Sequence, residues 1–387
     1  MLSVTASIFI CLLVSALYHL IPQTNWRSRF WLVAAVSFAV VLAYYPVAAV
    51  LAIACAVFSW TVTLLAARSH TVGKYGPLLI LPVLAVFSVE DFYVQKDPYS
   101  TTLVQFGMSF YVLRLYLAMR TQISRKQKGE LVEFLVTALF FPIFAAGPIC
   151  AQEAFRGSAD TNRSLSAQYL SGLYRIGIGI TFLYLFSYVV DWGISQTYQG
   201  PEGAGTPWAE IPMYTAYGLM FLGFLKLFVE FAGYTEVAIG LGMFFGFRIP
   251  ENFKHPYLAT NIQNFWQRWH LSLSRFITKQ IYMPLMLWWR KPRVAILAAF
   301  VLVGLWHHVN LQYLTWGLGH GLALFAYMTA SKSKRYQDLV SYVPRYLHIA
   351  LAWLLTMSWV SFLSVFANEP SLQQALAFAQ ALTPLTE

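Results

Sequence analysis

Three histidines lie within one strongly apolar part of the chain. His307 and His308 end an apolar segment, and His320 follows in the sequence WGLGHG. A neutral imidazole can take the proton of a hydroxyl group near neutral pH, which is the step that general-base catalysis requires. Ionisable side chains are costly in apolar surroundings and tend to mark functional sites there. We therefore expect chemistry at these residues and at His270, in the earlier sequence RWH.

Other uses of these histidines have less support. A single histidine in an apolar helix is usually a hydrogen-bonded helix contact, but three in one segment favour a functional site. The chain has no HxxxH, HExxH or CxxC spacing and no GxSxG elbow, so neither a metal site nor a serine-hydrolase triad is indicated. Cys150 is the one cysteine with a setting that could face a cavity, and we expect it to pack. Adjacent helical side chains point about 100° apart, which predicts different roles for His307 and His308.

A polar segment with aromatic residues precedes the three histidines, in the sequence NIQNFWQRWHLSLSRFITKQIYMPL. Its polar side chains recur every three or four residues, as on one face of a helix. The pattern predicts a short amphipathic helix at a cavity rim or a membrane surface, and a purely interfacial helix stays an alternative. The side chains of this face are Asn264, Arg268, Ser272, Arg275 and Lys279.

The composition indicates a membrane protein that must position these residues within helices. Of 387 residues, 58% are hydrophobic and 11% are charged, whereas soluble domains carry roughly 25% charged residues. A span needs about 20 apolar residues, so the chain can supply on the order of ten. The fold class predicted is all-α, a polytopic transmembrane helical bundle that forms a single domain over residues 1–387. The 26 Lys and Arg residues are scattered, which fits positive-inside topology and argues against a nucleic-acid partner.

Apolar segments predict the spans, and basic loops predict their orientation. The segment 131–150 is apolar but interrupted by Pro142, Gly147 and Pro148, so we expect a broken or re-entrant helix there. Loops 120–128, 290–293 and 332–335 are basic and predicted to be cytoplasmic, whereas 90–100 and 196–210 are predicted to lie outside. The other predicted spans are 2–21, read as a retained first span, and 30–45, 46–67, 77–89, 101–118, 169–190, 214–233, 294–306, 311–330 and 347–366.

Several long motifs resemble the membrane-bound O-acyltransferase family, in its bacterial envelope branch. They are FAGYTEVAIGLGMFFGFRIPENFKHPY, FWQRWHLSLSRF, GLWH and WGLGHG, in this order. The branch includes alginate O-acetylation proteins and D-alanyl transfer proteins of teichoic acid synthesis, and FGMSFYVLRLY and FFPIFAAGPI are more similar to the latter. The resemblance runs from about residue 106 to residue 322, which would be the catalytic core. The chain departs from the family at Thr278 to Gln280, where an Arg-Asp pair is usual.

The resemblance implies roles for individual residues. The family's catalytic histidine falls on His307 and its second functional histidine on His270, while His320 matches a later HG motif. It also implies a ring of roughly 10 to 12 helices with re-entrant segments and a central funnel. We predict substrate-binding side chains beside the two catalytic histidines, at Asn264, Trp266, Arg268, Trp269, Ser272, Trp306 and His320.

The same resemblance implies an enzyme of the bacterial inner membrane. It would transfer a D-alanyl or acetyl group from a cytoplasmic thioester to a hydroxyl of an extracytoplasmic envelope glycan. The donor would be a phosphopantetheine carrier protein or acyl-CoA, so an acyl carrier protein or accessory acyl-transfer protein is an expected partner, and no metal or permanently bound cofactor is expected. A transporter or flippase of a lipid-linked substrate is the main alternative, because intramembrane histidines and broken helices also line transport paths.

Overall fold

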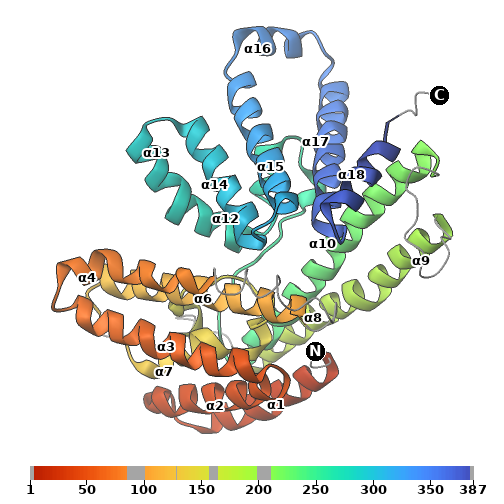
Figure 1. Ribbon diagram of the computed structural model, residues 1–387. Coiled ribbons are helices and arrows are strands. Elements are labelled where there is room, and N and C mark those ends of the chain that lie inside the picture. Colours follow the sequence, from red (N-terminus) through yellow and green to blue (C-terminus); the bar gives the residue numbers. More distant parts are fainter. Residues whose placement is uncertain (1–3, 85–100, 128, 157–163, 198–210, 384–387) are drawn as a thin grey trace. The chain divides into compact units, whose positions relative to one another are not determined.

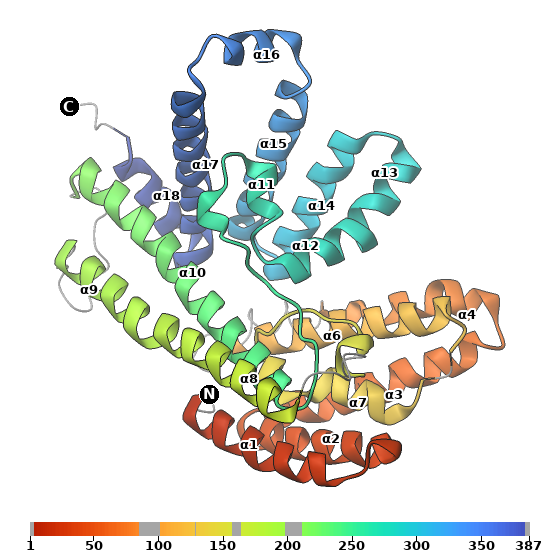
Figure 2. The same cartoon turned by 180° about the vertical axis from the view of Figure 1, so that it is seen from behind.

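A computed structural model describes residues 4–84, 101–127, 129–156, 164–197 and 211–383 of the chain, and only the backbone of residues 101–108. The regular secondary structure of this described part is helical, with no β-strand, which confirms the all-α prediction (Figures 1 and 2). The chain divides into two compact units, Met1–Ile180 with Gly233–Glu251 and Thr181–Ala232 with Asn252–Glu387. The predicted single domain, with a ring of helices and a central funnel, depends on how the two units fit together and stays a prediction.

The first unit is built around helix α3. This helix packs against α2, α6 and α7, and a 3-10 turn at Gly76–Ile80 leads away from α4. The unit contains α1 (Val4–Leu20), α2 (Trp26–Tyr44), α3 (Pro46–Ala66), α4 (His70–Tyr75), α6 (Thr101–Ser124), α7 (Leu131–Leu139), α8 (Leu165–Ile180) and the last part of α10 (Met213–Met243).

Helix α7 ends inside the apolar segment where a break was predicted. A 3-10 turn at Phe141–Ile143 follows it. The carbonyl groups at a helix end lack partners within the helix and need donors in an apolar environment. The fully buried Arg114 of α6 supplies them, donating to the backbone oxygens of Thr137 at 3.0 Å, Ala138 at 3.2 Å and Ile143 at 2.7 Å. The prediction of a broken segment is confirmed, and a buried arginine donates hydrogen bonds to the carbonyl groups at the break.

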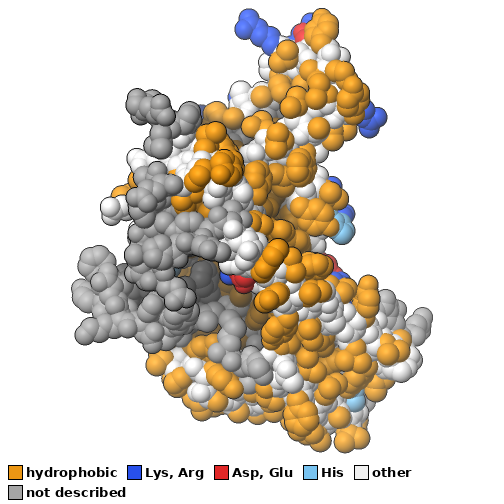
Figure 3. All heavy atoms as spheres, turned by 90° about the vertical axis from the view of Figure 1, so that its right-hand side faces the viewer, with side chains coloured by type: hydrophobic (Ala, Val, Ile, Leu, Met, Phe, Trp, Pro, Cys, Tyr) orange, Lys and Arg blue, Asp and Glu red, His pale blue; other side chains and the backbone are white. Residues whose placement is uncertain are grey.

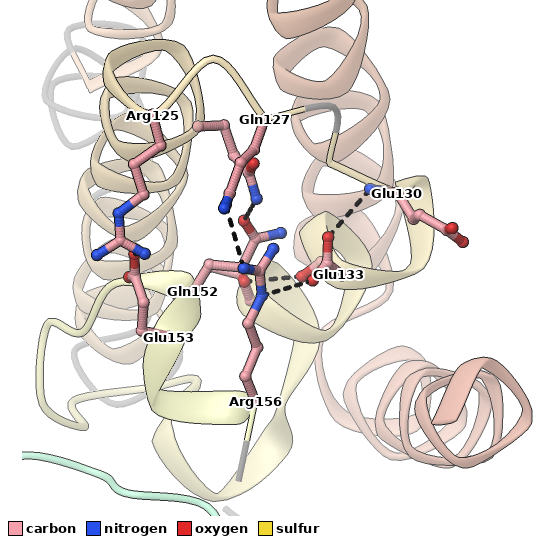
Figure 4. Close-up of polar contacts among 9 residues, drawn as sticks. Arg125, Gln127, Glu130, Glu133, Gln152, Glu153 and Arg156 are labelled. Carbon is pink, nitrogen blue, oxygen red and sulfur yellow. Dashed lines mark hydrogen bonds and ion pairs between the residues drawn. The ribbon is translucent and has the colours of Figure 1, made fainter. Parts of the chain in front are cut away.

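Two ion pairs hold the segment that follows this break, around residues 153–156, against α6 and α7. The Nη1 atom of Arg125 lies 2.8 Å from Oε1 of Glu153, and Nε of Arg156 lies 2.8 Å from Oε1 of Glu133 (Figure 4). Glu133 also accepts a hydrogen bond from the backbone N–H of Glu130 and so caps the first turn of α7. Both ends of the broken segment are therefore held by side-chain contacts.

Helices α8 and α10 of the first unit meet at glycines. A Cβ atom on Gly172 would lie 2.8 Å from the backbone oxygen of Gly240, and a Cβ atom on Gly179 would lie 2.6 Å from that of Gly233. Only residues without a side chain allow backbones to approach so closely. The contact between α8 and α10 therefore depends on glycine at these positions.

The second unit contains the histidine-bearing helices. α14 and α15 form a hairpin, and α15 also packs against α17 (Figure 1). The unit contains a π-helix (Thr181–Phe186), α9 (Ser187–Thr197), the first part of α10, α11 (Ile262–Trp266), α12 (Leu271–Ile277), a second π-helix (Thr278–Tyr282), α13 (Met283–Trp289), α14 (Pro292–His307), α15 (Leu311–Ala330), α16 (Lys334–Ser341), α17 (Arg345–Asn368) and α18 (Leu372–Ala381).

Five of the predicted spans correspond to helices that are long and apolar enough to cross a membrane. By length and composition, membrane-spanning segments are Gln23–Tyr44, Pro46–Ala66, Leu165–Gln196, Met213–Met243 and Arg345–Asn368. Hydrophobic side chains also cover much of the described surface in Figure 3. The predicted span 77–89 is wrong at its start, because the 3-10 turn Gly76–Ile80 lies there. Its residues from 85 onward lie outside the described residues, as do the loop 90–100 and residues 198–210 of the other outer loop. Helices α16 and α18 were not predicted.

Candidate active site

The hairpin of α14 and α15 sets the position of His307. A Cβ atom on Gly304 would lie 2.3 Å from the backbone oxygen of Tyr313, so the two helices touch there without an intervening side chain. His307 is the last residue of α14. Its ring stacks on that of Tyr313 at a centroid distance of 5.6 Å and meets the ring of Trp316 edge-on at 5.3 Å. Two residues of α15 thus orient the predicted base.

His308 does not lie in the helix with its neighbour. Its φ of −157° and ψ of 140° are those of an extended chain, because α14 ends at His307. The expected angle of about 100° between adjacent helical side chains therefore does not apply. The His308 ring lies 5.3 Å from that of Tyr313, so both histidines adjoin the same tyrosine.

His320 is buried on α15 and hydrogen-bonded to a predicted substrate-binding residue. Nε1 of Trp266 donates to Nδ1 of His320 over 3.3 Å, and the ring of Trp316 lies 4.7 Å from that of His320. A neutral imidazole that accepts at Nδ1 carries its proton at Nε2. Trp316 contacts His307 as well, so one tryptophan connects the two histidines of the hairpin.

The polar segment before the hairpin is not the single amphipathic helix that was predicted. α11 ends at Trp266, α12 begins at Leu271, and a π-helix follows at Thr278–Tyr282. His270 stands between the two helices with φ 43° and ψ 56°, a left-handed conformation that interrupts the helix. The prediction of one continuous polar face is therefore wrong.

A buried asparagine holds the backbone on one side of His270. The backbone oxygen of Asn252 accepts from the N–H of Leu271 at 2.8 Å, and its Oδ1 accepts from the N–H of Ser272 at 3.3 Å. On the other side, the N–H of Lys254 donates to the backbone oxygen of Arg268 at 2.9 Å. We name these three hydrogen bonds the 252–254 clamp. They fix the strained residue from both directions.

The ring of His270 is buried, with 4% of its surface exposed. Its centroid lies 4.8 Å from that of Phe231 in an edge-to-face contact. Burial lowers the pKa of His270 to about 3, and the charged form of His307 lowers it as well, so the His270 ring is neutral near neutral pH.

The other predicted substrate-binding residues fall into two groups. Trp306 lies beside the ring of His307 at 4.6 Å, in the same part of the unit as Trp266 and His320. In contrast, Nε of Arg268 donates to Oδ1 of Asn264 over 3.0 Å, and the remaining two have structural contacts. Trp269 stacks on Phe265 at 5.5 Å, and Ser272 is buried where its N–H meets the clamp.

Tyr313, Trp316, Phe231 and Asn252 were not predicted. Their contacts with the histidines join residues that are remote in sequence or lie beyond a helix end, and no spacing pattern signals such pairs. Among the described residues, no group of three or more His, Cys, Asp or Glu side chains could hold a metal ion. The site thus offers imidazole groups that can accept protons, and indole and phenol groups that can donate hydrogen bonds.

The family model of membrane-bound O-acyltransferases, MBOAT, matches residues 11–367. The chain belongs to this family. It is accordingly a multi-helix membrane protein, and the match includes all the histidines described above.

Three similar proteins illustrate the range of this family. A peptidoglycan O-acetyltransferase of Helicobacter pylori is 30% identical over 66% of the chain and 47% of its own length. A teichoic acid D-alanyltransferase of Bacillus subtilis is 30% identical over 63% of each. A protein of Pseudomonas syringae named "Probable alginate O-acetylase" is 29% identical over 73% of the chain and 57% of its own length. The chain spans about half to just under two thirds of these relatives, whose names all refer to acyl transfer to an envelope polymer.

Proposed function

We propose that the chain is an O-acyltransferase of the bacterial inner membrane that esterifies a hydroxyl group of an extracytoplasmic envelope glycan. The transferred group is D-alanyl or acetyl, as in the names of the relatives. The observation that carries the proposal is that His307, His270 and His320 lie in one compact unit of a chain from this family, where Trp316 contacts both His307 and His320. Histidines can also line the path of a flippase, but a flippase leaves its lipid-linked substrate chemically unmodified.

In the proposed reaction, His307 acts as the general base. The acceptor hydroxyl gives its proton to the imidazole while its oxygen attacks the carbonyl carbon of an acyl thioester. The C–O bond forms, the C–S bond breaks, and the thiolate that leaves takes the proton from the imidazole. The stacking of His307 on Tyr313 supports this role, because it holds the ring at a defined angle before substrate binds.

His270 is proposed to position or polarise one of the substrates. It is neutral and buried, and its backbone is fixed by the 252–254 clamp. His320 and Trp266 are proposed to line the same substrate site, where the proton on Nε2 of His320 is a hydrogen-bond donor. Trp306, beside His307, is a further proposed substrate contact.

The proposed donor is a cytoplasmic thioester, carried by phosphopantetheine on an acyl carrier protein or by coenzyme A. A carrier protein is acidic as a rule and needs a basic, partly apolar surface. We propose that such a carrier docks at Arg275, Lys279 and Trp288, which are exposed, and beside Arg268, which is largely engaged with Asn264. Trp289 completes this surface and is 37% exposed.

The test of the function is the ester itself. Envelope glycans from cells with and without the intact protein are compared by mass spectrometry. Cells that lack the protein are then complemented with the His307→Ala or the His308→Ala variant. We expect His307→Ala to lower product per folded molecule by roughly 10² to 10⁴, and His308→Ala to have the smaller effect. Unchanged glycans in cells that lack the protein would refute the transferase proposal. A folded, active His307→Ala protein would refute only the assignment of the base.

The need for a partner has a separate test. The chain is purified and supplied either with free acid and ATP or with a preformed acyl thioester. We expect an ester product only with the thioester, because a separate protein must activate the acid. Product from free acid and ATP alone would show that no activating partner is needed.

A further inference from the structure

Helix α16 carries an apolar face that the described residues leave partly uncovered. Tyr336, Leu339 and Val340 lie at the spacing of one helical face, and Val343 follows just beyond the end of the helix. No residue of the helix is buried, and 64% of the Leu339 side chain is exposed. Exposed apolar side chains that lie together on one helical face are typical of a site of interaction.

Cations surround this face. Lys334 and Arg335 lie in the first turn of α16, with Lys332 before it and Arg345 after it, and all four are exposed. Asp338 is the acidic residue of the helix. None of the four cations forms an ion pair within the part of the chain that the structure describes. Figure 3 shows Lys and Arg side chains beside hydrophobic ones at the top of the view, where α16 lies in Figure 1.

The position of α16 along the chain places it at a membrane surface. Three residues separate it from α15, which is 20 residues long, and three from α17, which is 24 residues long and a candidate membrane span. α17 is long and apolar enough to cross the hydrocarbon core, so a short helix just before it lies at the edge of that core. Tyr342 and Tyr346, which are 85% and 78% exposed, are residues typical of this interface.

We propose that α16 lies in the membrane–water interface and binds the head groups of anionic phospholipids. Its apolar face would enter the acyl-chain boundary, while Lys332, Lys334, Arg335 and Arg345 contact lipid phosphates. An acidic protein could meet the same cations, but Leu339 and the exposed tyrosines favour a lipid occupant, which covers apolar and charged groups together. This proposal does not depend on the acyl-transfer function.

A local fluorescence probe tests the proposal in the full chain. The three cysteines of the chain are buried, so Leu339→Cys can be labelled selectively and reconstituted into phosphatidylcholine bilayers. Quenching is then measured with brominated phosphatidylglycerol or brominated phosphatidylcholine as a minor component. We expect contact with both lipids and stronger quenching by the anionic one. One surface cation contributes about a fivefold change in local lipid preference, so Arg335→Gln should lower the preference by about that factor.

Arg125→Gln is the matched control, because Arg125 is ion-paired with Glu153 and its loss should leave the preference at position 339 unchanged. Equal quenching by the two lipids would overturn head-group selection. Absence of quenching by either lipid would overturn the interfacial position. An acidic carrier protein that protects the probe from both lipids would assign α16 to a protein partner instead.

Discussion

Replacing Asn252 with alanine removes one hydrogen bond of the clamp around His270 and leaves the other two. The lost bond joins Oδ1 of Asn252 to the N–H of Ser272 at 3.3 Å, in a place where Asn252 is fully buried. A buried donor left without its acceptor costs roughly 1 to 3 kcal/mol. A left-handed conformation of a residue such as His270 also stores about 1 to 2 kcal/mol, which the clamp must balance. We expect Asn252→Ala to lower stability by about 1 to 3 kcal/mol and to let His270 relax.

Asn252→Asp is the matched variant, because its carboxylate keeps an acceptor at the same position. Thermal unfolding in one detergent measures stability, and we expect the order wild type, Asp, Ala. Selective isotope labelling of the eight histidines reports the ring of His270 by NMR, with the signal assigned by its loss in His270→Gln. A displacement of the ring by about 1 Å would lower kcat about 10²-fold with little effect on KM.

The reasoning fails if Asn252→Ala unfolds at the wild-type temperature and leaves the His270 signal in place. That outcome would show that the clamp does not determine the conformation of His270. The NMR measurement does not require activity, so it also separates this failure from an error in the proposed function. A variant that is merely destabilised would move several histidine signals, whereas loss of the clamp should move that of His270 most.

Three further predictions rest on other contacts. Gly304→Ala should lower the unfolding temperature strongly, because its Cβ would overlap a backbone oxygen at 2.3 Å, whereas Gly177→Ala, with nothing within 4 Å, should be close to neutral. Arg114→Met should cost roughly 2 to 5 kcal/mol in thermal unfolding, since three helix-end carbonyls lose their donors. An impermeant thiol reagent on intact cells should label a cysteine placed at Gly203 and spare one at Gln127, and the reverse pattern would overturn the predicted orientation.

Hydrophobic patterns predicted the long helices because each span needs an uninterrupted run of apolar residues. The same patterns predicted the break after α7, since Pro142, Gly147 and Pro148 are residues that end helices. They could not identify Arg114 as the donor for that break. Its contacts with Thr137 and Ile143 join residues more than twenty positions apart, and spacing within one helix contains no information about them.

Failure of the pattern around His270 has a specific physical reason. A periodic face is evidence for a helix only when every backbone N–H can bond within it, and the N–H groups of Leu271 and Ser272 bond to Asn252 instead. Left-handed residues are usually glycine or asparagine. The left-handed conformation of a histidine therefore could not be predicted from the sequence. The resemblance identified His270 and His307 by motif, whereas the contacts that hold each of them emerged only from the structure.

The two histidines are held by devices of opposite kinds, and this difference predicts how each can be disturbed. His307 depends on a steric contact, in which Gly304 lets α14 reach the backbone of α15, so added atoms displace it. His270 depends on hydrogen bonds from the clamp, so removed atoms release it. Since neither device shares a residue with the other, a variant of Gly304 should leave the NMR signal of His270 nearly unchanged. A large shift of that signal in a folded Gly304→Ala protein would show that the two devices are not independent.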